Sequence, residues 1–206
     1  LFKNILEVLF LQENSRENSF LEDSETANSA TRYYTNFALS SQPHFSWHAL
    51  LPPPQTLFLQ NELGMMIDYA SYTLSIAQQN PHLNFATAPL PQIDQTKPVV
   101  NGALWGITVS RASLQSVVAW QAALLLTGKD LASPLVAAAH LTPARRDLLN
   151  SSNPLHTAAL QAKRIPDQNP AQTSSILAEM IDAVADGKRT VSEAVNEAKR
   201  KLEIIR

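Results

Sequence analysis

The chain of 206 residues contains no cysteine and only five glycines. The lack of cysteine excludes disulfide bonds, thiolate metal sites and cysteine nucleophiles. It suits an extracytoplasmic protein, which avoids stray oxidation, but it is also compatible with a cytosolic one. Because the glycines are scattered along the chain, the sequence has no glycine-rich loop of the kind that cradles phosphate groups.

Charge is sparse and evenly balanced. Charged residues make up 17% of the chain, the formal net charge is −2, and lysine and arginine form no basic block. Nucleic-acid binding is therefore disfavoured, because neutralising phosphates requires a concentrated positive surface. No apolar run approaches the roughly 18 to 20 residues that a membrane-spanning helix needs. Since the chain starts at Leu1 and shows no signal peptide, we expect its natural N-terminus and any export signal to lie outside this sequence.

Catalytic motifs are also missing. There is no G-x-S-x-G nucleophile motif and no H-E-x-x-H zinc motif. His44 and His48 flank Trp47, but Pro43 favours a loop, in which the spacing of the two imidazoles does not suit a metal. The sequence therefore predicts no enzymatic activity, no catalytic residue, no metal site and no cofactor.

Two pairs of carboxylates have the spacing of one helix face. Asp182 and Asp186 are one pair, and Glu193 and Glu197 are the other. Both pairs lie in strongly amphipathic stretches, so we interpret them as solvated surface rather than as a general acid–base site.

Apolar residues make up 45% of the chain, and most of them have helical spacing. Three apolar runs between glycine and proline breaks instead have the length of strands: Met65–Tyr69, Asn84–Ala88 and Leu104–Val109. Few strands among many helices favour an α/β fold in which the strands join one mixed sheet. The predicted helices are 3–12, 27–39, 56–61, 71–79, 114–127, one that ends at Gly187, and a last one that starts at Thr190.

Local capping signals predict where several helices start. Three pairs put a capping side chain directly before a proline: Ser133–Pro134, Thr142–Pro143 and Asn153–Pro154. A proline in the first helical turn loses no hydrogen bond, so each pair predicts a helix N-terminus. Thr190 with Glu193 three residues later predicts a capping box.

Four aromatic residues lie at predicted turns and strand ends rather than in the apolar stripes of helices: Trp47, Tyr69, Tyr72 and Trp105. Aromatic faces in a cleft stack on sugar rings, while the tyrosine hydroxyl and the indole N–H supply hydrogen bonds. The same residues are equally compatible with ordinary core packing, and periodicity does not distinguish the two.

The order of several segments resembles extracellular solute-binding proteins of the maltose-binding type. The segments are KNILEVLFLQENS, ATRYYTNFAL, FSWHALLPPPQTLFLQNELGMMIDYASY, NFATAPLPQ, NGALWGITVS, LTPARRDLL and RTVSEAVNEAKRKL. In the third segment Phe58, Gly64 and Met66 match the family's pattern, and Tyr72 stands where the family usually has tryptophan. The resemblance covers essentially the whole chain and corresponds to the C-terminal half of that family.

The resemblance implies a periplasmic-binding-protein-like lobe, helix-rich, with a mixed sheet flanked by helices. Residues 1–105 would form the first part of the C-terminal lobe, and residues 106–141 would cross to a largely missing second lobe. Residues 142–206 would return as closing helices. The helix over 114–127 would then present an exposed apolar face around Val117, Val118 and Leu125.

The implied function is the capture of an extracellular solute, a sugar or oligosaccharide, and its delivery by hinge closure to the permease subunits of an ABC transporter. The protein would be periplasmic or a membrane-anchored extracellular lipoprotein. The expected ligand-binding residues are Trp47, Tyr69, Tyr72, Asn101 and Trp105. A helical interaction or scaffold module without a small ligand is the alternative, and an enzyme is a third possibility.

Overall fold

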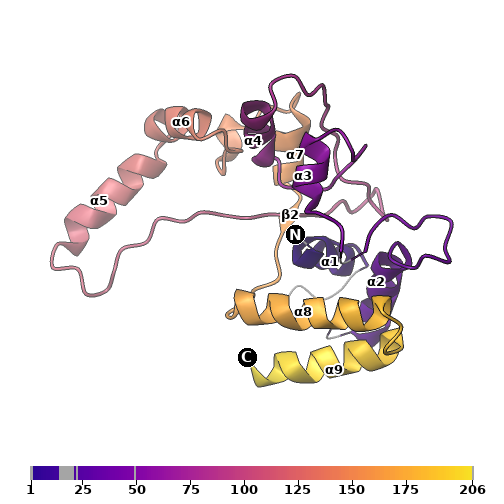
Figure 1. Cartoon of the computed structure of the whole chain (residues 1–206). Helices are drawn as coiled ribbons and strands as arrows, with labels where there is room; N and C mark the ends of the chain where they lie inside the picture. The colour runs from indigo at the N-terminus through magenta and orange to yellow at the C-terminus, as the bar shows by residue number, and fades with distance from the viewer. Residues whose placement is uncertain (1, 14–20, 22, 49, 206) are drawn as a thin grey trace. The chain divides into compact units, whose positions relative to one another are not determined.

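A computed structural model describes residues 2–13, 21, 23–48 and 50–205 of the chain (Figure 1). The chain divides into two compact units that are interleaved in sequence. Unit 1 comprises Leu1–Asp68, Leu90–Asn101 and Ala162–Arg206, and unit 2 comprises Tyr69–Pro89 and Gly102–Gln161. The chain therefore passes from one unit to the other four times.

Unit 1 consists mainly of helices. Its two strands, β1 (Val100–Asn101) and β2 (Ala162–Lys163), have two residues each and pair in parallel, with Val100 opposite Ala162 and Asn101 opposite Lys163. Its helices are α1 (Phe2–Gln12), α2 (Ser24–Asn36), α3 (Pro54–Leu59), α8 (Pro170–Ala185) and α9 (Val191–Ile204).

The α8–α9 hairpin follows directly from local sequence. The chain turns after α8 at Gly187, whose φ of 69° lies in the left-handed region that glycine adopts without strain. The capping box starts α9: the Thr190 hydroxyl accepts from the Glu193 backbone N–H, and the Glu193 carboxylate accepts from the Thr190 N–H. The predicted end of one helix and start of the next are thus confirmed.

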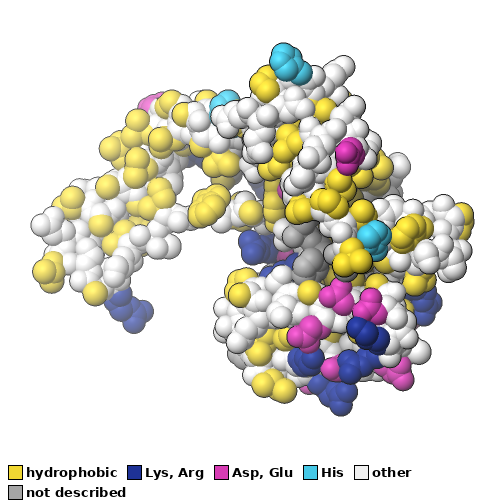
Figure 2. All heavy atoms as spheres, in the orientation of Figure 1, with side chains coloured by type: hydrophobic (Ala, Val, Ile, Leu, Met, Phe, Trp, Pro, Cys, Tyr) yellow, Lys and Arg dark blue, Asp and Glu magenta, His cyan; other side chains and the backbone are white. Residues whose placement is uncertain are grey.

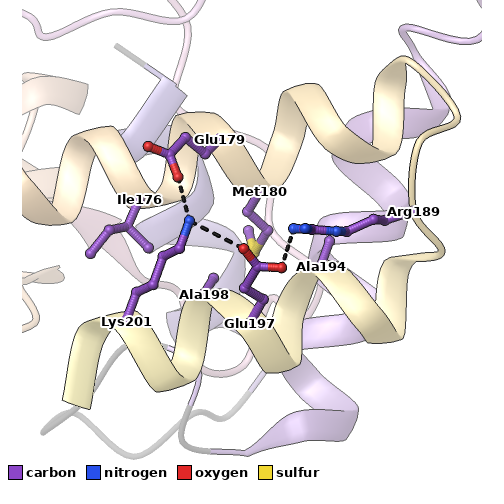
Figure 3. A pocket seen from close by; sticks show the side chains of 8 residues that line it. All are labelled: Ile176, Glu179, Met180, Arg189, Ala194, Glu197, Ala198 and Lys201. Carbon is purple, nitrogen blue, oxygen red and sulfur yellow. Dashed lines mark hydrogen bonds and ion pairs between the residues drawn. The ribbon is translucent and has the colours of Figure 1, made fainter. Parts of the chain in front are cut away.

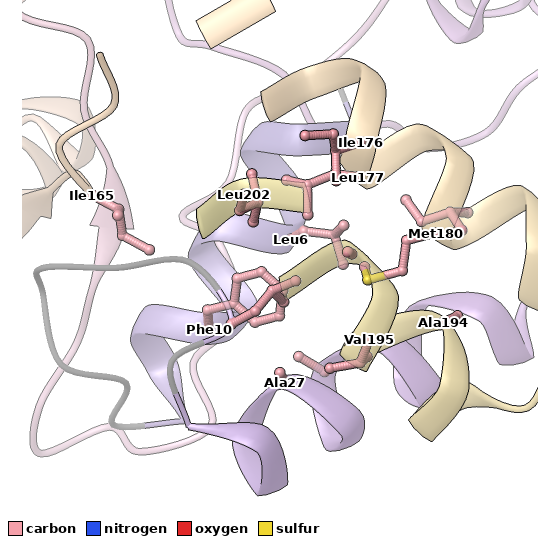
Figure 4. Packing of buried hydrophobic residues seen from close by; sticks show 14 of the residues in the cluster. Leu6, Phe10, Ala27, Ile165, Ile176, Leu177, Met180, Ala194, Val195 and Leu202 are labelled. Carbon is pink, nitrogen blue, oxygen red and sulfur yellow. The ribbon is translucent and has the colours of Figure 1, made fainter. Parts of the chain in front are cut away.

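The hydrophobic core of unit 1 lies among α1, α2, α8 and α9 (Figure 4). Leu6 and Phe10 of α1 point toward Leu177 of α8 and Val195 of α9, and all four side chains are essentially excluded from solvent. The core residues that α8 and α9 contribute recur at helical spacing. They are Ile176, Leu177, Met180, Ile181, Val184, Ala194, Val195, Ala198 and Leu202.

Unit 2 has far less buried surface. Among its helices only Ile76 and Ala123 are buried. The elements are α4 (Tyr72–Gln79), α5 (Ser116–Thr127), α6 (Lys129–Ala138), the 3-10 turn η1 (Arg146–Leu148) and α7 (Pro154–Ala159).

The prediction of an α/β lobe with a mixed sheet flanked by helices is wrong. Met65–Tyr69, Asn84–Ala88 and Leu104–Val109 form no strands, and β1 and β2 are the only strands in the described residues. A strand needs a neighbour for its backbone hydrogen bonds, and an apolar run shows only that the side chains avoid water. These segments have no such neighbour, and Met65 and Leu104 are among the most exposed apolar residues.

The proline signals were correct at one site of three. Asn153–Pro154 starts α7, with the Asn153 side chain accepting from the Leu155 backbone N–H. Pro134 instead lies inside α6, because that helix already starts after Gly128, and no helix begins at Thr142–Pro143. A capping pair shows that a helix can start at that point. Whether it does depends on the preceding residues, which can already be helical.

Substitution of Leu177 by alanine tests the core of unit 1. Leu177 is fully buried, so we expect the loss of its side chain to lower the free energy of unfolding by about 2–5 kcal/mol. Ile204→Ala on α9, where the side chain is 83% exposed, is the matched control and should have little effect. Denaturant titration of both variants measures the difference, and equal effects would contradict this description of the core.

Candidate functional site

The five residues expected to bind ligand lie in both units. Trp47 and Asn101 belong to unit 1, whereas Tyr69, Tyr72 and Trp105 belong to unit 2. Their convergence on one ligand remains a prediction, and the surroundings of each residue are described separately.

Trp47 is half-buried against the core of unit 1. Its ring lies 5.3 Å from the ring of Tyr34 on α2, centroid to centroid, and burial raises the pKa of the Tyr34 hydroxyl. Contacts of this kind contribute to packing whether or not a ligand binds. Trp47 therefore has a structural role in the loop after α2.

Tyr69 and Tyr72 mark the turn that starts α4. The backbone N–H of Tyr72 donates to the carbonyl of Tyr69 at 2.9 Å, and both side chains are half-buried. Trp105 differs from them, because it is 89% exposed in the irregular segment that follows β1. Of the three expected ligand-binding residues in unit 2, Trp105 has the ring that is most available for stacking.

Asn101, at the end of β1, contacts α1. Its side-chain N–H donates to Oε2 of Glu7 at 3.0 Å and to the carbonyl of Asn4 at 3.5 Å. Its Oδ1 is buried and has no hydrogen-bond partner among the described residues. Asn101 therefore belongs to a buried polar cluster whose other members sequence reasoning did not identify.

Glu7 is the centre of this cluster, and only 2% of its surface is exposed. Its Oε1 accepts from the backbone N–H of Ile165 at 2.5 Å, while Oε2 accepts from Asn101. Burial raises the pKa of the Glu7 carboxyl, and the two hydrogen bonds and the nearby charges of Arg164 and Lys3 oppose that rise. The effect of burial is the larger one.

Lys3, one turn earlier on α1, forms a nearly buried ion pair with Asp167. Their Nζ and Oδ2 atoms are 2.5 Å apart, and the side chains are 11% and 6% exposed. Burial alone would raise the pKa of Asp167. The hydrogen bonds from Lys3, from the Thr173 hydroxyl and from the Asn169 backbone N–H together hold it below its usual value.

Gln12 extends the polar contacts of α1 to the segment before β1. Its side-chain N–H donates to the carbonyl of Val99 at 3.2 Å and to Oε1 of Gln92 at 3.1 Å. Lys3, Asn4, Glu7 and Gln12 are the polar residues of a helix that is otherwise apolar, and Lys3 and Glu7 are four residues apart. Two charges at this spacing inside an apolar stretch were the signal that could have revealed the cluster.

Of the two predicted carboxylate pairs, Asp186 forms an ion pair with Lys188, Glu193 belongs to the capping box of α9, and Glu197 forms ion pairs on the surface of α9. Lys201 contacts Glu179 at 2.6 Å and Glu197 at 3.2 Å, and Arg189 contacts Glu197 from the other side (Figure 3). The gap between these side chains is about 10 Å³, which is room for a single water. A second, open depression of about 370 Å³ on the same helices is lined by none of the five expected ligand residues.

His44 and His48 lie against phenylalanine rings. The imidazole of His44 is 5.1 Å from the ring of Phe37, and that of His48 is 6.2 Å from the ring of Phe45 and parallel to it. Both histidines are exposed side chains of the loop after α2. Within the described ranges, no group of three histidine, aspartate or glutamate residues is placed to hold a metal ion.

The most apolar surface of unit 2 lies on α5. Its sequence has no charged residue between Arg111 and Lys129, and only Ala123 is buried. Val117, Val118 and Leu125 are 69%, 58% and 65% exposed, as expected for this helix. Figure 2 shows hydrophobic side chains along α5 and α6, whereas acidic and basic side chains gather over α8 and α9.

In comparisons with known proteins, no family model, no curated protein and no solved structure matches the chain. No helix in the described part of the chain is both long and apolar enough to cross a membrane. Function must therefore be proposed from the order of sequence segments and from the two units.

The Glu7→Gln variant tests whether burial of the ionised Glu7 carboxylate lowers the stability of the folded chain. Because burial raises the pKa of Glu7, its contribution to stability is greatest below the ordinary value of 4.5 and falls as pH rises through the raised pKa. The glutamine variant should therefore be more stable than the parent chain at neutral pH, and the difference should shrink as pH falls. Denaturant titrations from neutral to acid pH measure this, with Glu203→Gln on the surface of α9 as the control. A variant less stable at neutral pH would contradict it.

The double variant Val117→Lys/Leu124→Lys tests the α5 surface. Both side chains are 69% exposed, so we expect little change in the free energy of unfolding and a lower tendency to self-associate. Sedimentation at rising protein concentration, together with binding of a hydrophobic dye, measures the second effect. Strong destabilisation would show instead that α5 is buried in solution.

Proposed function

We propose that the chain is a non-enzymatic solute-binding protein that captures a sugar or oligosaccharide outside the cytoplasm and delivers it to the permease of an ABC transporter. The ordered resemblance to solute-binding proteins of the maltose-binding type supports this proposal. The α/β lobe that the same resemblance implies is contradicted by the structure, so the proposal is based on the order of the segments and on the two units.

The observation that carries the proposal is the interleaving of the two units. Two units joined by several crossings of the chain can change their arrangement through a few connecting residues while each stays folded. In the proposed mechanism the solute favours one arrangement, and the permease recognises that arrangement. No bond is made or broken.

Trp105 is the residue on which we expect the solute to stack. Its ring is 89% exposed, and it lies four residues beyond the point where the chain leaves unit 1. A flat apolar ring with one N–H donor suits the apolar face and the hydroxyl groups of a neutral sugar. Tyr72 would contribute a second ring.

A helical interaction module is the second candidate, and the exposed surface of α5 favours it. An uncharged helix that is apolar on all sides is usually buried in a protein core. If α5 binds another protein, the chain would function through that contact and would not need a small ligand.

The two candidates are separated by calorimetric titration of the chain with neutral oligosaccharides, after a thermal-shift screen for binders. Solute binding predicts heat that saturates at one solute per chain. Loss of one stacking surface should cost on the order of 1–3 kcal/mol, an estimate taken from base–aromatic stacking. Trp105→Ala and Tyr72→Ala should therefore each weaken binding about tenfold or more.

Tyr33→Ala is the matched control, because it removes an exposed ring of unit 1 that lies outside the expected site. The Tyr33→Ala variant should bind the saccharide with the same affinity as the parent chain. Absence of saturable heat with every saccharide, or equal losses in the control, would refute solute binding at Trp105 and favour the interaction module.

A further inference from the structure

The strands β1 and β2 lie where the chain leaves unit 1 and returns to it. Asn101, the last residue of β1, precedes the long segment of unit 2 that starts at Gly102. Ala162, the first residue of β2, follows the end of that segment. Because the two strands pair, the exit and the return are side by side in unit 1.

Glu7 links both of these connections to α1. One carboxylate oxygen accepts from the Asn101 side chain of β1, and the other accepts from the backbone N–H of Ile165, two residues beyond β2. Its neighbours Leu6 and Val8 are buried, so the backbone that carries Glu7 is itself held in the core. One side chain thus holds two segments that are far apart in sequence.

This arrangement is costly for stability. An ionised carboxylate in a buried position loses hydration, and its partners here are chiefly neutral N–H groups rather than a direct ion pair. An aliphatic side chain would avoid that cost, but it would leave the Ile165 N–H and the Asn101 amide without this acceptor. The carboxylate has two acceptor oxygens, so it can hold a donor from β1 and a donor from the segment after β2 at the same time.

We propose that Glu7 is a clamp that fixes the two connecting strands to α1 and to each other, and that uptake of a proton by its carboxyl group loosens the clamp at β1. The proton comes from solvent and adds to Oε2. That oxygen then carries a hydrogen that faces the Asn101 N–H, and the hydrogen bond is lost. Oε1 still accepts from Ile165. The clamp goes beyond solute binding, because it acts on the connections whichever ligand the chain takes.

The charges around Glu7 determine how readily the clamp loosens. Lys3 approaches from α1 and Arg164 from the segment after β2, and both favour the ionised carboxylate. Lys3 is also paired with Asp167, which lowers its effect on Glu7. Burial outweighs both cations and raises the pKa of Glu7, so loosening begins at milder acidity than for an exposed glutamate.

The absence of cysteine permits a direct test with two spin labels. One label is attached through Gln95→Cys, in the segment before β1, and the other through Asn196→Cys on α9; both side chains are exposed, and both residues belong to unit 1. Pulsed electron paramagnetic resonance spectroscopy then gives the distribution of distances between the two labels. We expect this distribution to broaden as pH falls from neutral toward the ordinary glutamate value of 4.5.

Two substitutions separate the clamp from a general effect of acid. Glu7→Gln imitates the protonated carboxyl, because it keeps the acceptor for Ile165 but places an N–H where Oε2 accepted from Asn101. Its distribution should therefore be broad at every pH and should not change with acid. Glu7→Leu removes both bonds, and its distribution should be broad at every pH. Glu25→Gln, an exposed residue of α2, should broaden as the parent chain does.

A Glu7→Gln distribution that is as narrow as that of the parent at neutral pH, or that broadens with acid as the parent does, would overturn the proposal. A narrow distribution in a folded Glu7→Leu variant would do the same. If circular dichroism shows that the leucine variant does not fold, the pH profile of the glutamine variant decides. Saccharide binding is measured separately, so a chain that binds no saccharide leaves this test intact.

Discussion

The buried carboxylate of Glu7 constrains unit 1, because it accepts hydrogen bonds from two segments that are far from α1 in sequence. A charged group inside the core needs hydrogen-bond donors, and the donors to Glu7 of α1 belong to β1 and to the segment after β2. The same helix must also bury Leu6 and Phe10 against α8 and α9. With an apolar face and a polar face both satisfied, α1 has one orientation, and the two connections to unit 2 are positioned with it.

The two units differ in how they are stabilised. Unit 1 has a continuous core among four helices, reinforced by a nearly buried ion pair and by surface ion pairs between α8 and α9. Unit 2 buries almost none of its helical side chains, and α5 exposes valine and leucine on several sides. Apolar area exposed in this way contributes nothing to folding, since only area removed from water stabilises. Unit 1 therefore carries most of the stability of the chain.

This difference bears on function. Solute binding would use the exposed Trp105 and the connections between units, whereas an interaction module would use α5. Both depend on unit 2, in which Trp105 and most of the apolar side chains of α5 and α6 are exposed. The polar contacts of Lys3, Glu7 and Gln12 serve a different purpose, because they maintain the points at which the chain enters and leaves unit 2.

The sequence by itself determined the features that depend on neighbouring residues. The capping box at Thr190, the cap at Asn153 and the turn at Gly187 each involve hydrogen bonds or backbone angles within a few residues, so composition and spacing suffice. The strand predictions failed because a strand exists only if a distant segment pairs with it. Lys3 and Asp167 are 164 residues apart, and Glu7 and Ile165 are 158 residues apart. Only the tertiary structure decided those contacts, since no local pattern specifies which remote donor meets a buried charge.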